Sequence, residues 1–305
     1  MRITFCCYIR GEVNGMKTAR YLHEWVNIRS IDLRPRTVES YRATIANHIV
    51  PMLGSVPLKR LTPEHIVPLL ARLQATGHVR TAQLVYVILS AALRAAEDRD
   101  LIRRSPMRSI KKPSHQQAMR RYLTNAELAT YTQAAFRDPN RVAWMLALLC
   151  GLRRGEICGL RWSDVDLTGN LLHIRNQRVR ITGVGLRDAP PKSRAGCRSV
   201  PIPAVLLPLL QQGQQSSGYV VELQPEALDR AHRRMCITCG LPPVTPHGLR
   251  HTLASQGIRH GVHIKVLQCL LGHADFGTTA NIYAHVEAEA LSKAVSSLTG
   301  AIAAG

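Results

Sequence analysis

Apolar residues recur at intervals of three and four through the first third of the chain, a spacing typical of amphipathic helices. Between residues 36 and 49, one such face consists of Val38, Tyr41, Ile45 and either His48 or Ile49. Residues 17–110 are therefore predicted to form a helical domain.

Two further helices are expected in this domain. The first begins at Thr62, because threonine suits the N-cap and Pro63 suits the first helical position, although Pro68 is placed to kink it. Its apolar surface comes from Val67, Leu69, Leu70 and Leu73. The second covers residues 81–99, and its apolar stripe consists of Leu84, Val87, Ile88, Ala91, Ala92 and Ala95. Stripes of this kind favour the core of a helix bundle.

The helical periodicity is lost over residues 102–121, which are rich in Arg, Lys, Pro, Ser and Gln. A domain boundary is expected here, with residues 111–121 as a basic linker. Such a linker is either solvated or lies along a DNA backbone, and the composition allows both.

A second domain, residues 122–305, follows. Thr124 and Glu127 have the spacing of a capping box, and residues 142–149 read as a buried apolar helix. Between residues 170 and 203, apolar and polar residues alternate and glycines and prolines mark turns, so a small antiparallel sheet is predicted. Helices are expected again after Pro225.

Charge narrows the class of partner. The 305 residues contain 40 Lys plus Arg against 20 Asp plus Glu, a net charge of +20. Residues 17–113 carry a net charge of +10 and residues 114–305 carry +9. The positive charge is therefore not concentrated in a tail, and both halves are suited to binding the same polyanion. A basic ribosomal-type protein fits this distribution as well.

The same composition bears on the compartment. No apolar run reaches the roughly 18 residues that span a bilayer, so a cytoplasmic protein without a membrane partner is expected. Eight scattered cysteines are too few for a disulfide scaffold, which agrees with a reducing compartment.

Several segments contain residues suited to phosphate chemistry. His247 and Arg250 are three residues apart in a predicted helix and hence lie on one face. Arg153 follows a buried apolar helix, where a charge is costly without an anionic partner. Each residue has an ordinary alternative: Arg153 or Arg154 can pair with Glu156, and Tyr283 can be a core tyrosine.

Taken in order, these segments resemble the tyrosine recombinase (phage integrase) family. The matching pieces are Gly-Leu-Arg153-Arg-Gly-Glu156, a lysine at 192, His247-Gly-Leu-Arg250, Gly-His273 and then Tyr283. The family often has Asp where this chain has Gly248, a difference that puts the rigidity of that helix start in question.

The resemblance implies a role for each matching residue. Arg153 and Arg250 would clamp the scissile phosphate, His247 and His273 would assist proton movement, Lys192 would protonate the leaving 5′-hydroxyl, and Tyr283 would be the nucleophile. Glu156 would be a buried support, and His251 is expected to be structural. No metal or nucleotide cofactor is expected, because a phosphotyrosyl ester conserves the energy of the cut strand.

The expected fold is mainly α with a small antiparallel sheet: a short extension (residues 1–16), a helical core-binding domain (17–110), the linker (111–121) and an α+β catalytic domain ending in a helical tail (122–305). Residues 1–16 are too short for the arm-binding domain of larger phage integrases. The resemblance further implies a C-shaped clamp, a homotetramer on two duplex DNA attachment sites, and an excisionase or DNA-bending protein as accessory partner.

Three alternatives stay open. Cys236, Cys239, His247 and His251 mimic a Cys₂His₂ zinc set, although the gap of seven residues between the pairs is shorter than usual. A type IB topoisomerase-like enzyme or chromosome-dimer resolvase would use the same residues. A basic DNA-binding protein without catalysis would use only the charge.

Overall fold

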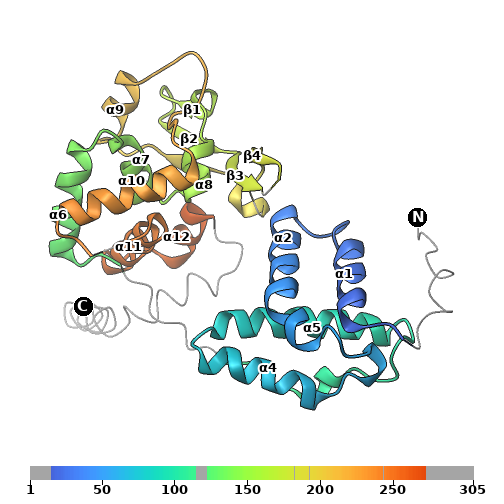
Figure 1. The fold of residues 1–305 in the computed structure, drawn as a ribbon. Coiled ribbons are helices and arrows are strands. Elements are labelled where there is room, and N and C mark those ends of the chain that lie inside the picture. The colour runs from blue at the N-terminus through green and yellow to red at the C-terminus, as the bar shows by residue number, and fades with distance from the viewer. Residues whose placement is uncertain (1–14, 115–121, 182, 192, 243, 273–305) are drawn as a thin grey trace, which may run out of the picture. The chain divides into compact units, whose positions relative to one another are not determined.

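The computed structural model describes residues 15–114, 122–181, 183–191, 193–242 and 244–272. The chain divides into two compact units, with the division between residues 118 and 119. Each unit has a hydrophobic core of its own, and the elements of each unit can be followed in Figure 1.

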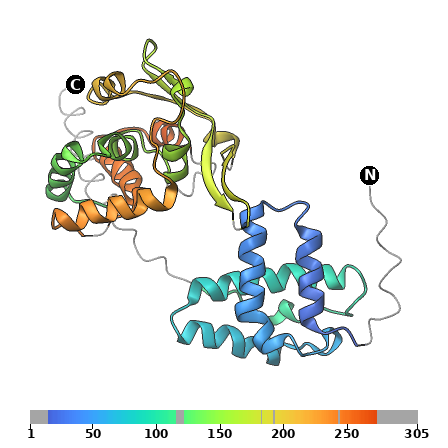
Figure 2. The same ribbon diagram turned by 45° about the horizontal axis from the view of Figure 1, so that its top comes forward.

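The regular elements in the described part of the first unit are all helices. Its α-helices are α1 (Thr18–Arg29), α2 (Pro35–Thr44), α3 (Val50–Leu53), α4 (Pro63–Ala75) and α5 (Val79–Glu97). The helices α1 and α2 lie side by side and cross the pair formed by α4 and α5 (Figures 1 and 2). Trp25 from α1 is buried and stacks on Tyr41 from α2, with 6.1 Å between ring centroids.

The helix predicted over residues 36–49 differs from the observed structure at its end. After Thr44 the chain makes a π turn, Ile45–Ile49, in which the Val50 amide donates to the Ile45 carbonyl, and then continues as α3. Pro51 offers a physical reason, because proline has no N–H and its ring would clash with the carbonyl four residues earlier in an ordinary α-helix. Val38, Ile45 and Ile49 are buried as predicted.

The start of α4 is confirmed, with Thr62 at the N-cap and Pro63 at the first helical position, and the helix continues through Pro68. The predicted apolar surface of α4 is correct for Leu69, Leu70 and Leu73, whereas Val67 is exposed.

The stripe predicted for α5 is correct for Ile88 and Ala92, but the buried face as a whole is rotated by about one residue. The buried residues of this helix are Ala82, Val85, Ile88, Leu89, Ala92, Leu93 and Ala96. Val87 and Ala91, which the prediction placed inside, are exposed. By length and composition α5 is the one helix of the described residues that could cross a membrane, and its buried face lies in this core.

The segment after α5 is more ordered than its composition indicates. Ile102 and Met107 are buried, and a 3-10 turn, Pro106–Ser109, is tied to α5 by an ion pair of 2.6 Å between Arg108 and Glu97. Residues 102–110 thus pack on the first unit. Residues 115–121 of the predicted linker lie outside the described residues.

The second unit contains the helices α6 (Asn125–Arg137), α7 (Arg141–Leu149), α8 (Arg154–Gly159), α9 (Leu207–Gln212), α10 (Pro225–Thr238), α11 (Pro246–Arg259) and α12 (Ile264–Leu271). The predicted capping box starts α6: the Glu127 amide donates to Thr124 Oγ1 at 3.3 Å and the Thr124 amide to Glu127 Oε2 at 2.9 Å. The apolar helix α7 is buried between α6, α8 and α11.

The antiparallel pairing predicted between residues 170 and 203 is observed, in two pieces. Strands β1 (Val165–Asp166), β2 (Leu171–Ile174) and β5 (Arg198–Pro201) form one sheet, and β3 (Gln177–Ile181) and β4 (Gly185–Ala189) form a hairpin. Leu172, Ile174 and Val200 point into the core. The hairpin extends from the helices of its own unit (Figure 2), and β3 packs on α8. The expected fold class, mainly α with small antiparallel sheets, is confirmed.

Candidate active site

Arg153 is held at the start of α8. Its amide donates to Glu156 Oε2 at 2.9 Å and its guanidinium donates to Glu156 Oε1 at 2.6 Å, so the Glu156 carboxylate accepts from both the backbone and the side chain of the residue that precedes α8. A second guanidinium nitrogen donates to the Gly272 carbonyl at 2.9 Å. The Arg153 side chain keeps 35% of its surface exposed, which leaves it accessible to a ligand.

Arg250 enters the same place from α11. Its guanidinium donates to the Gly151 carbonyl at 2.6 Å and also to the Leu271 carbonyl. The residue is 1% exposed, and its Nε is buried without a partner among the described residues. Burial, and secondarily the positive charge of Arg153, lower the pKa of Arg250 below its ordinary value. An anion at this site would raise the pKa of Arg250 again, because it favours the charged form.

Glu156 is the acidic centre of the cluster. Its side chain is 2% exposed and forms ion pairs with both Arg153 and Arg198. Burial alone would raise the pKa of this carboxyl, but hydrogen bonds and charge from Arg198, with Arg153, outweigh burial and lower it. The supporting role expected for Glu156 is confirmed in these contacts. The alternative pairing of Arg154 is not observed, because Arg154 pairs with Asp229 instead.

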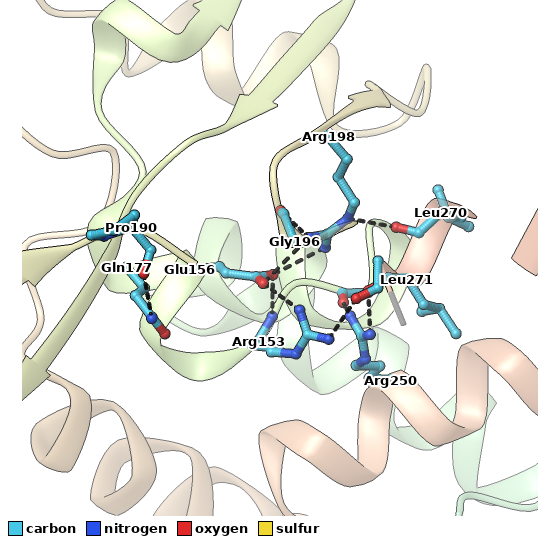
Figure 3. A network of polar contacts seen from close by, with 11 residues as sticks. Arg153, Glu156, Gln177, Pro190, Gly196, Arg198, Arg250, Leu270 and Leu271 are labelled. Carbon is cyan, nitrogen blue, oxygen red and sulfur yellow. Dashed lines mark hydrogen bonds and ion pairs between the residues drawn. The ribbon is translucent and has the colours of Figure 1, made fainter. Parts of the chain in front are cut away.

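Three successive carbonyls at the C-terminal end of α12 each accept a hydrogen bond from a different arginine. Arg198 Nε donates to Leu270 at 2.7 Å and Arg250 donates to Leu271 (Figure 3), and Arg153 donates to Gly272. The end of a helix has carbonyls without partners in the helix and carries partial negative charge, so it favours cations.

Two glycines allow the arginines to lie this close to the end of α12. Gly151 and Gly272 both have a φ of +61°, which L side chains rarely adopt. A Cβ on Gly151 would lie 2.6 Å from Leu271 Cδ2, and one on Gly272 would lie 2.6 Å from the Ala195 carbonyl oxygen. The carbonyls of these two glycines accept from Arg250 and Arg153, so backbone shape and arginine positions are coupled.

His247 lies one turn before Arg250 on α11, but the two side chains differ in setting. His247 is exposed, whereas Arg250 is buried. The ring of His247 meets that of His251 edge-on, with 4.8 Å between centroids. Thr245 caps the helix by accepting from the Gly248 amide at 3.1 Å, and the Gly248 carbonyl accepts from Thr252, so Gly248 is held on both sides.

Arg153, Arg250 and Glu156 are thus brought together, and His247 lies one helical turn away from the cluster. Lys192, His273 and Tyr283 lie outside the described residues. Among those described, no group of three His, Cys, Asp or Glu side chains is placed to hold a metal ion, and this includes Cys236, Cys239, His247 and His251.

Sequence reasoning missed Arg198. It lies at the start of β5, and its guanidinium contacts Glu156, Gly196 and Leu270. A signal was available, because Arg198 is only six residues after Lys192. Only the fold reveals that this arginine is directed at Glu156 and at the end of α12.

The cluster as described contains three guanidinium groups and one carboxylate, an excess of two positive charges in a largely buried place (Figure 3). Guanidinium groups donate paired hydrogen bonds that match the oxygens of a phosphate. The geometry is therefore that of an anion site whose exposed member is Arg153.

Comparison with known proteins gives concordant matches. Residues 116–290 match the model of the phage integrase family, and residues 19–113 match that of the phage integrase central domain. The chain is 30% identical over 281 residues to the prophage phiRv2 integrase of Mycobacterium tuberculosis, a match that covers 86% of this chain and 73% of that protein.

Solved structures agree in fold. The Tn1549 transposon integrase in complex with transposon right end DNA matches with a TM-score of 0.78 at 21% identity, over 93% of this chain and 100% of that one. A lambda integrase tetramer bound to a Holliday junction matches with a TM-score of 0.66 at 22% identity, over 87% and 79% of the two chains.

Proposed function

Because the chain belongs to the phage integrase family, we propose that it integrates or excises a phage or other mobile element by cutting and rejoining DNA through a covalent bond to Tyr283. It is a tyrosine-type site-specific recombinase, and its substrate is DNA. The observation that carries the proposal is the anion site formed by Arg153 and Arg250, with its excess positive charge.

In the proposed reaction, Arg153 and Arg250 bind the scissile phosphate. Arg250 is fixed by two carbonyls, and Arg153 is fixed by Glu156 and Gly272 while part of it stays exposed. Preorganised donors of this kind stabilise charge that develops on the non-bridging oxygens without rearranging during the reaction.

The chemical step exchanges one phosphate ester for another. The Tyr283 hydroxyl loses its proton, with His247 and His273 as the proposed proton acceptors and phosphate ligands, and its oxygen attacks the phosphorus. The bond from phosphorus to the 5′-oxygen breaks, and that oxygen takes a proton from Lys192. The product is a 3′-phosphotyrosyl ester, which a 5′-hydroxyl of another strand reverses.

The described neighbours of Lys192 and His273 support these roles. His273 follows Gly272, whose carbonyl accepts from Arg153. Lys192 follows Pro191, which lies against Gly196, and the carbonyls of Ala195 and Gly196 lie against Gly272 and Arg198 respectively. The loop of the proposed general acid therefore contacts the same end of α12 as the arginines.

The functions that we propose for the domains use the domain boundaries predicted from the sequence. Residues 17–110 grip the core site of the DNA, residues 111–121 link the domains, residues 122–305 carry the chemistry, and residues 1–16 form a short extension. Four copies act on two duplex attachment sites, assisted by an excisionase or a DNA-bending protein, in the cytoplasm. The structure of lambda integrase, which has a similar fold, is a tetramer bound to a Holliday junction, and this supports the proposed assembly.

A nicked suicide substrate that contains the attachment site tests the function. The wild-type protein is expected to form a covalent adduct, seen on a denaturing gel, and Tyr283→Phe is expected to form none while binding duplex within a few fold, because only the nucleophilic oxygen is lost. An adduct in Tyr283→Phe would remove Tyr283 from the mechanism. If the wild type gave no adduct on a verified site, the binding-only alternative would replace the proposal.

A further inference from the structure

We propose that Arg198 is a positioning residue for strand cleavage, which joins Glu156, the loop before β5 and the end of α12 so that Arg153 and Arg250 are held at the phosphate site. The inference rests on the proposed function of those two arginines. It adds a residue whose own guanidinium is not available to the substrate.

The contacts of Arg198 use most of its donors within the protein. Its Nε donates to the Leu270 carbonyl at 2.7 Å, one terminal nitrogen donates to Gly196 at 3.1 Å and to Glu156 at 3.3 Å, and the other donates to Glu156 at 3.0 Å. A guanidinium has five N–H donors, and four of them are accounted for here. The side chain is 7% exposed, whereas that of Arg153 is 35% exposed.

The paired bonds from Arg198 to Glu156 determine how Glu156 meets Arg153. Each carboxylate oxygen of Glu156 is shared, since Oε1 accepts from both guanidinium groups and Oε2 accepts from Arg198 and from the Arg153 amide. Without Arg198, the carboxylate would be held only by Arg153 itself, and no other residue would fix the position of the 2.6 Å bond that orients the Arg153 guanidinium.

The hydrogen bond to the Leu270 carbonyl fixes the end of α12, the third part of the protein that Arg198 contacts. Leu270, Leu271 and Gly272 are consecutive, so a shift of the Leu270 carbonyl also displaces the acceptors of Arg250 and Arg153. Arg198 comes from β5, on the far side of the loop that contains Lys192, and thus ties that loop to the same turn.

Removing Arg198 also changes the titration of Glu156. The charged groups that face Glu156 are Arg153 from the start of α8, Arg198 from β5 and, at longer range, Arg250 from α11. Arg198 is the main cause that lowers the pKa of Glu156 against its burial. In Arg198→Met the pKa of Glu156 therefore rises, and the carboxylate that accepts from Arg153 is lost as the pH falls through the new pKa.

The test compares Arg198→Met, Arg198→Lys and the control Arg175→Met in single-turnover cleavage at saturating DNA, duplex binding and thermal unfolding. Arg175 directly follows β2, the strand that pairs with β5, but it is 63% exposed and pairs with Asp164 outside the cluster. We expect Arg198→Met to cleave about 10²-fold more slowly while binding duplex within a few fold, since small misplacements of catalytic groups cost about that much. The cleavage rate of Arg198→Lys should lie between those of Arg198→Met and the wild type, because lysine keeps the positive charge but lacks the paired donors of a guanidinium.

Two further measurements separate positioning from a purely structural role. The cleavage rate of Arg198→Met should acquire an acid limb that the wild type lacks, and the additional change Glu156→Gln should remove that limb. The carboxyl carbon of Glu156, followed by NMR against pH without DNA, should titrate higher in Arg198→Met than in the wild type.

The outcomes are distinct. An unchanged Glu156 titration, or a wild-type cleavage rate in Arg198→Met or Arg198→Lys, would overturn the role of Arg198 while leaving the recombinase intact. If Arg198→Met did not fold, the rate, pH profile and Glu156 titration of Arg198→Lys would decide. Failure of the wild type itself to form an adduct would instead contradict the proposed function, and the Glu156 titration would still test the contacts of Arg198.

Discussion

At the scale of single residues, the charges of the cluster favour the transition state over the bound substrate. Three guanidinium groups and one carboxylate leave an excess of two positive charges among the described residues. A phosphodiester has one negative charge, and attack by a phenolate brings a second. The described charges therefore balance when both are present, so we expect the site to interact more strongly with the transition state than with the bound phosphodiester.

Arg153→Ala tests this balance, with Arg154→Ala as its neighbour in sequence and matched control. Arg153 lies in the cluster, whereas the guanidinium of Arg154 pairs with Asp229. We expect Arg153→Ala to slow single-turnover cleavage by about 10²- to 10³-fold, equivalent to about 3 to 4 kcal/mol, because a positioned charged donor is lost. Arg154→Ala should cleave at nearly the wild-type rate. An equal loss of cleavage rate in both variants would mean that Arg153 is only one of many contacts with the DNA backbone.

At the scale of elements, the sequence predicts where helices begin better than which face they bury. Thr62 and Thr124 mark their helix starts through chemistry local to a few residues. In α5, apolar residues occupy nearly every side, so a stripe through Leu84 and Ala91 and one through Val85 and Leu89 both have helical spacing. Only packing against α2 and α4 selects the second.

The turn at Gly151 is the element that links α7 to the cluster, and Gly151→Ala tests it against Gly261→Ala. Both glycines have positive φ, but a Cβ at Gly261 would meet nothing within 4 Å, whereas one at Gly151 would lie 2.6 Å from Leu271. The control isolates backbone strain of about 1 kcal/mol. We expect Gly151→Ala to lose a further 1 to 3 kcal/mol, roughly the cost of overpacking.

Denaturant unfolding of the two variants measures this difference. Gly151→Ala should also cleave more slowly, since the Gly151 carbonyl holds Arg250. Equal stability of the two variants would show that the contact of Gly151 with Leu271 is not tight.

At the scale of the whole molecule, the ordered motifs predicted the arginines of the site across about a hundred residues of sequence, because each guanidinium is a recognisable group. The acceptors were not predictable, since Gly151, Leu271 and Gly272 contribute backbone carbonyls, which every residue has. Arg198 was missed for a different reason: its guanidinium is as recognisable as the others, but its importance comes from its contacts with Glu156 and the end of α12, which only the fold shows. The roles of Lys192, His273 and Tyr283 stay predictions.

Cleavage is expected to proceed in EDTA and without ATP. The phosphotyrosyl ester conserves the energy of the broken bond, and Arg153 and Arg250 are proposed to supply the positive charge that other enzymes take from metal ions. The gel assay with the suicide substrate, run with and without chelator, measures this. Loss of cleavage on chelation, together with stoichiometric zinc by elemental analysis, would revive the set of Cys236, Cys239, His247 and His251.

Affinity for duplex DNA is expected to depend on charge spread over both domains rather than on the catalytic cluster. Residues 17–113 carry +10 and residues 114–305 carry +9, so many phosphate contacts are available and each releases counterions. The logarithm of the affinity should fall linearly with the logarithm of the salt concentration. Arg153→Ala should reduce the slope by at most about 1, the share of one phosphate contact.

Titrations of labelled duplex at several salt concentrations, for the wild type and Arg153→Ala, provide the slopes. Arg154→Ala again serves as control, because its exposed guanidinium lies outside the cluster. If Arg153→Ala lost binding in proportion to its lost cleavage rate, the phosphate held by Arg153 would contribute to ground-state affinity as much as to the transition state. Arg153 would then be a DNA-binding residue, and its assignment to the catalytic step would have to be withdrawn.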